Sequence, residues 1–262
     1  MAKSPALAIA AILALVALSG RPAQAAEASC TAPSELTRLD REIAHTAAHL
    51  AAGRSLKIVA FGSSSTQGAG ASTPDKTYPS RLQAQLRERF PEMDITVVNR
   101  GIGGEDAREM LARLDRDVIA ERPDLVLWQV ATNAIVDDEK VSVEATLVQT
   151  GLRRLKAAGI DVIIVDPQYA PAVIRKARAG AMVKMLEQVA ARAQVAVFHR
   201  YAIMGHWRVA GRIPFEQFTS RDGLHMNDWS YDCISKLLAD AIVDAGSRNV
   251  AGKVATASRS RS

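Results

Sequence analysis

Beyond its first 25 residues, the sequence has no apolar run long enough to cross a bilayer, so we expect no membrane span in the mature protein. It also lacks an internal repeat, and it lacks the compositional bias of collagen, coiled coils or disordered chains. Of its 262 residues, 48% are apolar and 23% are charged. A chain of this length and composition can build one sizeable core, which indicates a single domain.

The folded part also lacks an excess of positive charge. The whole chain carries a net charge of +5, but two unmatched cations lie in residues 1–25 and four lie in residues 247–262. Residues 26–246 therefore carry a net charge of −1, which removes the main electrostatic argument for a nucleic-acid partner. Residues 247–262 are rich in Ser, Ala, Arg and Gly, a composition that predicts a mobile basic tail.

Residues 1–25 have the pattern of a secretory signal peptide. Lys3 precedes an apolar run over residues 6–18, and residues 23–25 (AQA) give a small-x-small cleavage pattern. The run is short for a membrane span, although an uncleaved anchor is the alternative. We therefore expect a periplasmic or secreted protein whose domain covers residues 26–246.

Cysteine is scarce, with Cys30 and Cys233 as the two in the chain. In an oxidising compartment an even number of cysteines favours a disulfide, which here would join the start of the mature chain to its last helix. Two unpaired thiols are the alternative.

The middle of the chain alternates apolar strands with amphipathic helices. Strands that are apolar on both faces, separated by such helices, predict an α/β fold with a parallel sheet covered on both sides. Ligands bind such sheets at the carboxyl ends of the strands, so the residues that follow each strand are the first candidates for function. The expected strands are residues 57–61, 95–98, 125–130, 160–165 and 195–198, and the expected helices are residues 77–90, 105–120, 141–155 and 173–193, with a final helix around residues 234–242.

Three polar segments follow the first three strands. Residues 62–68 (GSSSTQG) place hydroxyl side chains between glycines, where a serine can attack a carbonyl if a base is near, although a helix N-cap is an equal alternative. Residues 99–104 (NRGIGG) offer backbone N–H groups that suit a developing oxyanion, or they are a flexible connector. Asn133 can donate a hydrogen bond into the same space, or it can form an Asx turn.

A fourth segment, residues 222–227, contains Asp222 and His225 directly before the last helix. At this spacing in a loop the carboxylate can meet the imidazole, fix its tautomer and stabilise the imidazolium. Metal binding is the rival interpretation. We expect no metal and no cofactor, because no second histidine or cysteine lies at ligand spacing and a zinc site normally takes three protein ligands.

These four segments, in this order, resemble the signature blocks of the SGNH (GDSL) hydrolases. Residues 62–68 are similar to the family's G-D-S-x-T-x-G block, and residues 99–104 to its glycine block. Residues 131–133 (ATN) are similar to the G-x-N block, and Asp222 and His225 to the D-x-x-H block. Ser63 stands where the family usually has aspartate, and Ala131 stands where it has glycine.

The resemblance implies a three-layer, flavodoxin-like α/β/α sandwich of about five parallel strands and a serine esterase without a metal. Ser64 would be the nucleophile, with His225 as its base and Asp222 as the partner of His225. The oxyanion hole would consist of the amides of Ser64 and Gly104 and the side chain of Asn133. An acyl-enzyme would form and then be hydrolysed by water that His225 activates.

The substrate is less defined than the reaction. The aromatic residues between positions 200 and 221 fit a pocket wall for sugar rings or short acyl chains, and they fit plain packing equally well. We expect a small-molecule or glycan ester, with acetyl or other short acyl groups on carbohydrate favoured. The alternatives are an acyltransferase with the same residues, a lysophospholipase or thioesterase-like lipid hydrolase, and a non-catalytic glycan-binding module.

Overall fold

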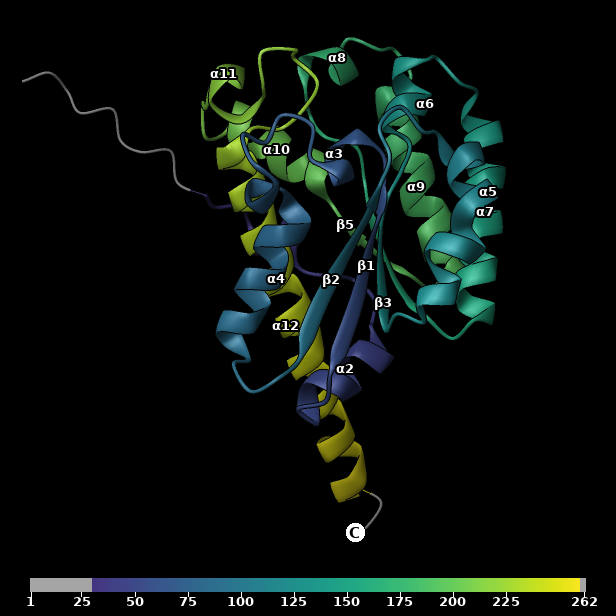
Figure 1. Cartoon of the computed structure of the whole chain (residues 1–262), viewed down its shortest axis with the longest axis vertical. Coiled ribbons are helices and arrows are strands. Elements are labelled where there is room, and N and C mark those ends of the chain that lie inside the picture. Colours follow the sequence, from purple (N-terminus) through teal and green to yellow (C-terminus); the bar gives the residue numbers. More distant parts are fainter. Residues whose placement is uncertain (1–29, 260–262) are drawn as a thin grey trace, which may run out of the picture.

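A parallel sheet forms the centre of the molecule. The computed structural model describes the backbone of residues 30–259 and the side chains of residues 30–248. The five strands pair in the order β2-β1-β3-β4-β5, with parallel pairing throughout. The predicted parallel sheet is therefore confirmed, and the order changes direction at β1 (Figure 1). The strands are β1 (Leu56–Gly62), β2 (Ile95–Gly101), β3 (Leu125–Gln129), β4 (Asp161–Val165) and β5 (Ala196–Phe198).

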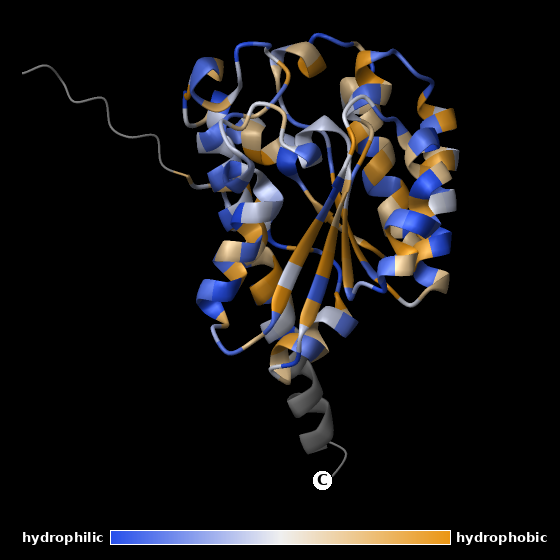
Figure 2. Ribbon diagram, viewed as in Figure 1, coloured by the Kyte–Doolittle hydropathy of each residue, from blue (hydrophilic) through white to orange (hydrophobic). Residues whose placement is uncertain are grey.

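The strands are apolar on both faces because each face packs against a layer of helices. Along β1, Ile58 and Ala60 belong to one buried cluster, while Val59 and Phe61 belong to the other. In the hydropathy view the strands are mostly orange, and the helices alternate between blue and orange (Figure 2). This alternation is typical of helices with one side on a sheet and the other in water.

Two groups of helices cover the sheet. One buried cluster takes most of its helical residues from α2, α4, α10 and α12, and the other takes most of them from α5, α6, α7 and α9. Figure 1 shows α4 and α12 on one side of the sheet and α5, α7 and α9 on the other, so the expected three-layer sandwich is confirmed. The bounds are α2 (Ala44–Ala51), α4 (Tyr78–Arg89), α5 (Ala107–Asp117), α6 (Thr132–Val136), α7 (Val141–Ala157), α9 (Ala179–Ala193), α10 (Arg200–Val209) and α12 (Asp228–Arg259).

One expected helix is divided. In place of a single helix over residues 173–193, the structure has α8 and α9, with a break between them. At the break, Lys176 Nζ lies 2.6 Å from Asp138 Oδ2, and the Arg178 guanidinium donates to the carbonyl oxygen of Asp138. The break thus coincides with contacts to a distant loop. Hydrophobic periodicity along the sequence carries no information about such contacts. The other short elements are α1 (Ser34–Thr37), α3 (Ser64–Gln67), η1 (Pro74–Lys76), η2 (Ile119–Glu121), α8 (Pro171–Ile174) and α11 (Phe215–Phe218).

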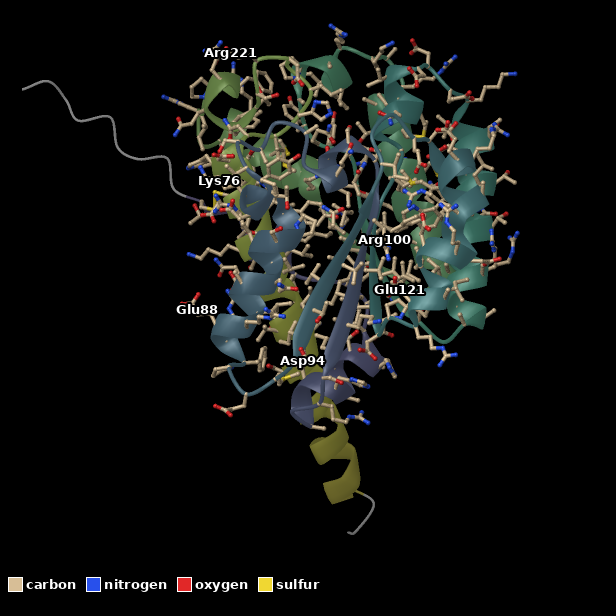
Figure 3. All side chains as sticks on the ribbon, viewed as in Figure 1. Lys76, Glu88, Asp94, Arg100, Glu121 and Arg221 are labelled. Carbon is tan, nitrogen blue, oxygen red and sulfur yellow. A yellow bond between two sulfur atoms is a disulfide. The ribbon has the colours of Figure 1, made fainter. Side chains whose placement is uncertain are left out.

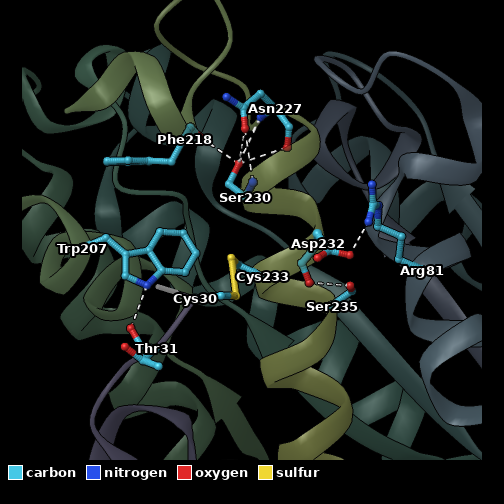
Figure 4. Close-up of a disulfide and its surroundings, with 10 residues drawn as sticks. All are labelled: Cys30, Thr31, Arg81, Trp207, Phe218, Asn227, Ser230, Asp232, Cys233 and Ser235. Atoms are coloured by element: carbon cyan, nitrogen blue, oxygen red, sulfur yellow. Dashed lines mark hydrogen bonds and ion pairs between the residues drawn. A yellow bond between two sulfur atoms is a disulfide. The ribbon is translucent and has the colours of Figure 1, made fainter. Parts of the chain in front are cut away.

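The start of the described chain is attached to α12. Cys30 and Cys233 form a disulfide, as the even cysteine count favoured (Figure 4). Beside it, the indole N–H of Trp207 donates to the carbonyl oxygen of Thr31 at 3.0 Å. Cys233 is only 2% exposed, so the bond lies in the packed interior between α10 and α12.

The ends of the predicted domain lie partly outside the described residues. The predicted signal peptide, residues 1–25, is outside them. Helix α12 passes the expected boundary at residue 246 and continues to Arg259, so most of the expected tail has a helical backbone, and its mobility stays a prediction. Among the described helices, none combines the length and the apolar character that a membrane span requires.

Candidate active site

Ser64 lies in the tight turn that follows β1. The strand ends at Gly62, and Ser64 is the first residue of α3. The short helix packs closely on the end of β2, because a Cβ added to Gly101 would lie only 2.1 Å from the backbone nitrogen of Gln67. This close approach holds the half-buried Ser64 at the carboxyl edge of the sheet.

The loop before α12 is organised around Asp222. Its Oδ1 accepts hydrogen bonds from the hydroxyl of Ser220 at 2.6 Å and from the backbone N–H groups of Leu224 and His225, each at 2.9 Å. The N–H of Ser220 in turn donates to the carbonyl oxygen of His225 at 2.8 Å. These bonds fix the loop and leave Oδ2 of Asp222 free to face the imidazole.

The structure brings Ser64, His225 and Asp222 together, although Ser64 and His225 are 161 residues apart in the chain. Nδ1 of His225 lies 2.6 Å from Asp222 Oδ2, and Nε2 lies 2.7 Å from Ser64 Oγ. A carboxylate can only accept, so Nδ1 carries the proton and the lone pair of Nε2 faces the serine hydroxyl. The side chain of His225 is 15% exposed, which keeps the imidazole within reach of a substrate.

The pKa of Asp222 is held below its usual range. Partial burial acts to raise the pKa, but hydrogen bonds from Ser220, from the His225 ring and from two backbone N–H groups favour the charged form and together outweigh it. Asp222 is therefore an anion at neutral pH. An anion at this position orients the imidazole and stabilises its protonated form.

The predicted oxyanion residues lie around the same turn. Gly103 is beside Ser64, since a Cβ added to this glycine would lie 3.7 Å from Ser64 Cβ, and Gly104 follows with a left-handed φ of +85°. The side chain of Asn133 donates to the carbonyl oxygen of Glu105 at 2.8 Å, which ties the start of α6 to the glycine loop. An amide has a second N–H to offer, so Asn133 can also face a bound ligand.

Gln129 is a site residue that the sequence analysis missed. Its side-chain oxygen accepts from the N–H and the hydroxyl of Ser63, at 2.9 and 3.1 Å, and from the hydroxyl of Thr66 at 3.2 Å. It thereby fixes both ends of the turn that carries Ser64, at the position where Ser63 replaces the family's aspartate. The available signal was a glutamine within an otherwise apolar run, residues 125–130 (LVLWQV).

Arg113 is a second residue that the sequence analysis missed. Its guanidinium donates to the carbonyl oxygens of Gly62 at 3.2 Å and Arg100 at 3.0 Å, and to the carboxylate of Glu105 at 2.7 Å. It thus ties together the ends of β1 and β2 and the start of the next helix. The signal was an arginine three residues after Met110, on the apolar face of its helix.

The aromatic segment divides into two groups. Trp207 and Phe218 are buried and pack edge to face, so they serve the core. Tyr169, Tyr201 and Phe215 are partly exposed, with ring centroids 5.0 and 6.1 Å apart. The first two follow β4 and β5 in the chain, so this group lies at the carboxyl edge and remains the candidate for a pocket wall.

Metal-ligand geometry is found elsewhere in the molecule. Within the described part of the chain, the one group of three or more converging ligand side chains consists of His45, His49 and Asp124. His225 and Asp222 do not belong to such a group.

Solved structures of esterases and lipases share this fold. A two-domain esterase active on acetylated mannans superposes with a TM-score of 0.67 at 21% identity, covering 80% of this chain and 56% of that one. A lipase/acylhydrolase from Enterococcus faecalis superposes with a TM-score of 0.58 at 23% identity, covering 74% of this chain and 96% of that one. At these identities the likeness shows the fold alone.

Sequence similarity gives the family. An acetylxylan esterase from Geobacillus stearothermophilus is 38% identical over 58 residues, which are 22% of this chain and 26% of that protein. This chain thus spans about a quarter of the length of that relative. The model of the non-GDSL lipase-like family matches residues 29–248. The chain therefore belongs to the non-GDSL lipase-like family, and the resemblance of its motifs to the SGNH/GDSL hydrolases is confirmed.

Proposed function

We propose that the protein is a serine esterase that removes acetyl or other short acyl groups from carbohydrate. One observation carries the proposal: the continuous hydrogen-bonded chain from Ser64 through His225 to Asp222 at the carboxyl edge of the sheet. A hydroxyl, an imidazole and a carboxylate in this order activate a serine for acyl transfer. The family assignment supports the same chemistry.

The reaction begins with proton transfer from Ser64 to Nε2 of His225 as Oγ attacks the ester carbonyl. The new imidazolium is stabilised by the anionic Asp222, and the oxyanion accepts from the N–H groups of Ser64 and Gly104 and from the side chain of Asn133. His225 then gives its proton to the leaving alcohol, which departs from the acyl-enzyme. In the second half, His225 takes a proton from water, the hydroxide attacks the acyl group, and the acid leaves as Oγ recovers its proton.

A carbohydrate substrate is supported by the surroundings of the turn. A cavity of about 440 Å³ begins at Gln67, in α3, and Ser72, Thr77 and Asn99 are among the residues that line it. Side chains of this kind can accept hydrogen bonds from the hydroxyl groups of a sugar. The similarity to esterases named for acetylated mannans and acetylxylan supports the same class of substrate.

Export is the second part of the proposal. The signal-peptide pattern of residues 1–25 directs the chain out of the cytoplasm, and the Cys30–Cys233 disulfide is suited to an oxidising compartment. We therefore propose a periplasmic or secreted enzyme that meets its glycan outside the cytoplasm.

Labelling of the mature protein with a fluorophosphonate probe, followed by peptide mapping, tests the nucleophile. We expect the label on Ser64, and Ser64→Ala should abolish both labelling and acetate release from acetylated xylan or mannan. Ser65→Ala is the matched control, because the buried hydroxyl of Ser65 has no hydrogen-bond partner among the described residues and its loss should leave activity nearly unchanged.

Three outcomes would overturn the proposal in distinct ways. Absence of any label would favour a non-catalytic glycan-binding module, and a label on Ser63 would move the nucleophile. Greater activity on long-chain than on acetyl p-nitrophenyl esters would favour a lipid hydrolase. Transfer of the acyl group to an added carbohydrate acceptor, in place of release as acid, would identify an acyltransferase.

A further inference from the structure

Two histidines and an aspartate converge at the amino edge of the sheet, at the opposite end from Ser64. His45 and His49 lie on α2, and Asp124 directly precedes β3. Nε2 of His45 is 3.0 Å and Nε2 of His49 is 3.6 Å from the same oxygen, Asp124 Oδ1. All three ligand atoms lie within 4.8 Å of one another.

The position of this cluster separates it from the proposed active site. Figure 1 shows α2 at the lower end of the molecule and α3 at the upper end. In Figure 3, Arg221, the neighbour of Asp222, is labelled at the top, while Asp94, whose carbonyl oxygen accepts from the N–H of Leu56 at the start of β1, is labelled near the bottom. The cluster is therefore independent of the proposed esterase reaction.

The local structure orients each of the three side chains. His45 and His49 are four residues apart, one helical turn, so both face the same side of α2. The helix start is fixed from β4, because Asp161 Oδ2 accepts from the N–H of Thr46 at 2.7 Å. Asp124 is fixed by its other oxygen, Oδ2, which accepts from the N–H of Lys57 at 2.7 Å and so leaves Oδ1 directed at the histidines.

The hydrogen bonds of His49 point to a missing positive charge. Its Nδ1 lies 2.6 Å from the carbonyl oxygen of Ser55, and a carbonyl can only accept, so Nδ1 carries a proton. In the neutral ring, Nε2 then has a lone pair, and this lone pair faces the Asp124 carboxylate. Two electron pairs in this arrangement repel each other, unless a cation or a doubly donating water molecule lies between them or the ring itself is protonated.

The nearby lysine does not supply this charge to Asp124. Nζ of Lys57 is directed instead at Glu121, 3.0 Å from its carbonyl oxygen and 3.3 Å from its carboxylate. The remaining sources of positive charge are a metal ion and protonation of the histidines. A histidine ligand whose other ring nitrogen donates to a backbone carbonyl is the usual arrangement in metal sites, because this bond sets the tautomer that exposes the ligand nitrogen.

We propose that His45, His49 and Asp124 bind a divalent transition metal, zinc in the first place, and that the bound ion stabilises the fold. Ligands bound to zinc at about 2.0–2.1 Å in tetrahedral geometry lie about 3.4 Å apart, and the 3.0 and 3.6 Å separations on Asp124 Oδ1 bracket this value. Two imidazoles and a carboxylate suit zinc, with water in the fourth position. His45 is 48% exposed, which gives the ion a route from solvent.

The bound ion would attach α2 to the loop before β3. It would cross-link an N-terminal helix to the centre of the sheet. A ligand that binds only the folded state raises its stability by mass action. At a hundredfold excess of free zinc over Kd, we expect Tm to rise by about 5–10 °C for a domain of this size.

The test uses the mature protein without a histidine tag, treated with EDTA and dialysed. Calorimetric titration with ZnCl2 at pH 7.5 should show one zinc per chain, and thermal unfolding should show the rise in Tm, reversed by EDTA. His45→Ala and His49→Ala should each lose zinc binding and the zinc-dependent rise. His206→Ala, a histidine on α10 outside the cluster, is the matched control and should keep both.

Absence of stoichiometric zinc binding, or a Tm that does not respond to zinc in the unaltered protein, would overturn the proposal. Binding that survives in His45→Ala and His49→Ala would also overturn it, because the ion would then lie elsewhere. Zinc binding and Tm are measured without a substrate, so the test does not depend on the proposed reaction. We expect esterase activity to be the same with zinc and with EDTA.

Discussion

The carboxyl and amino edges of the sheet each place histidine beside aspartate, but the two ring nitrogens of the imidazole contact different groups at the two edges. At the carboxyl edge, His225 donates to Asp222 through one nitrogen and faces the hydroxyl of Ser64 through the other. At the amino edge, His49 is held by a backbone carbonyl oxygen through one nitrogen and faces Asp124 through the other. The same side chains therefore offer a proton acceptor at one edge and a ligand for a cation at the other.

The two carboxylates differ in the same way. Asp222 accepts from one imidazole, one hydroxyl and two backbone N–H groups, which leave it committed to the loop that carries it. Asp124 uses one oxygen for a backbone N–H and presents the other to two imidazoles. The role of a histidine–carboxylate pair is thus set by what the second ring nitrogen meets, and a short spacing in the sequence does not reveal it.

The largest expected effect is the difference in kcat between a variant that loses an imidazole at the carboxyl edge and one that loses an imidazole at the amino edge. We expect His225→Ala to lower kcat by about 10⁴- to 10⁶-fold, because Ser64 loses the base that accepts its proton. His45→Ala should leave kcat within about twofold, because it lies at the other end of the sheet. Steady-state hydrolysis of p-nitrophenyl acetate by both variants makes the comparison, and a large loss in His45→Ala would erase the distinction between the edges.

A smaller effect should follow from Asn133→Ala. Loss of one oxyanion donor typically lowers kcat by about 10²- to 10³-fold. The variant also loses the bond to the carbonyl oxygen of Glu105, so thermal unfolding is needed beside the kinetics. A fall in kcat with KM and Tm nearly unchanged would support a role in the transition state. A large fall in Tm with normal kcat would limit Asn133 to holding the glycine loop.

Glu144 tests the contrast between a carboxyl group rich in hydrogen bonds and one without them. Burial raises its pKa to about 7, and one of its oxygens has no partner among the described residues. The unfolded chain releases this proton near pH 4.5, while the folded chain keeps it until about pH 7, so stability should fall as pH rises through this window. In Glu144→Gln, the fall in the free energy of unfolding across this pH window should be smaller by about 2–3 kcal/mol.

Denaturant unfolding at pH 5 and pH 8 measures this difference. Asp166, whose pKa burial also raises to about 7, should leave part of the pH dependence in the variant. Glu92→Gln is the control, because this glutamate is exposed and its replacement should leave the pH dependence as it is in the unaltered protein. If the free energy of unfolding changed between pH 5 and pH 8 by the same amount in Glu144→Gln as in the unaltered protein, the carboxyl group of Glu144 would be solvated.

The sequence predicted the frame of the fold and the proposed triad. Apolar runs located the strands, and the rule that ligands bind at the carboxyl ends of parallel strands directed attention to Ser64 and Asn133. Asp222 and His225 were found because three residues separate them in one loop. The inference of the fold succeeded because it depends on local order along the chain, whereas the catalytic roles of these residues stay predictions.

The residues that escaped prediction act across the fold. Gln129 and Arg113 occupy positions where periodicity predicts apolar side chains, and their partners come from other strands and loops. His45 and His49 stand one helical turn apart, but Asp124 is 79 residues beyond His45, so the convergence becomes visible only in three dimensions. The spacing of the two histidines is the one local signal of this cluster in the sequence.

The disulfide has a consequence for the integrity of the chain. Cys30 and Cys233 are 203 positions apart, so the bond closes almost the whole domain into one covalent ring. A protease that cuts a surface loop inside this ring leaves two fragments that stay joined outside the reducing cytoplasm. The nicked protein would therefore migrate as one species until a reductant releases its halves, and an enzyme exposed to proteases would keep its parts together after a first cut.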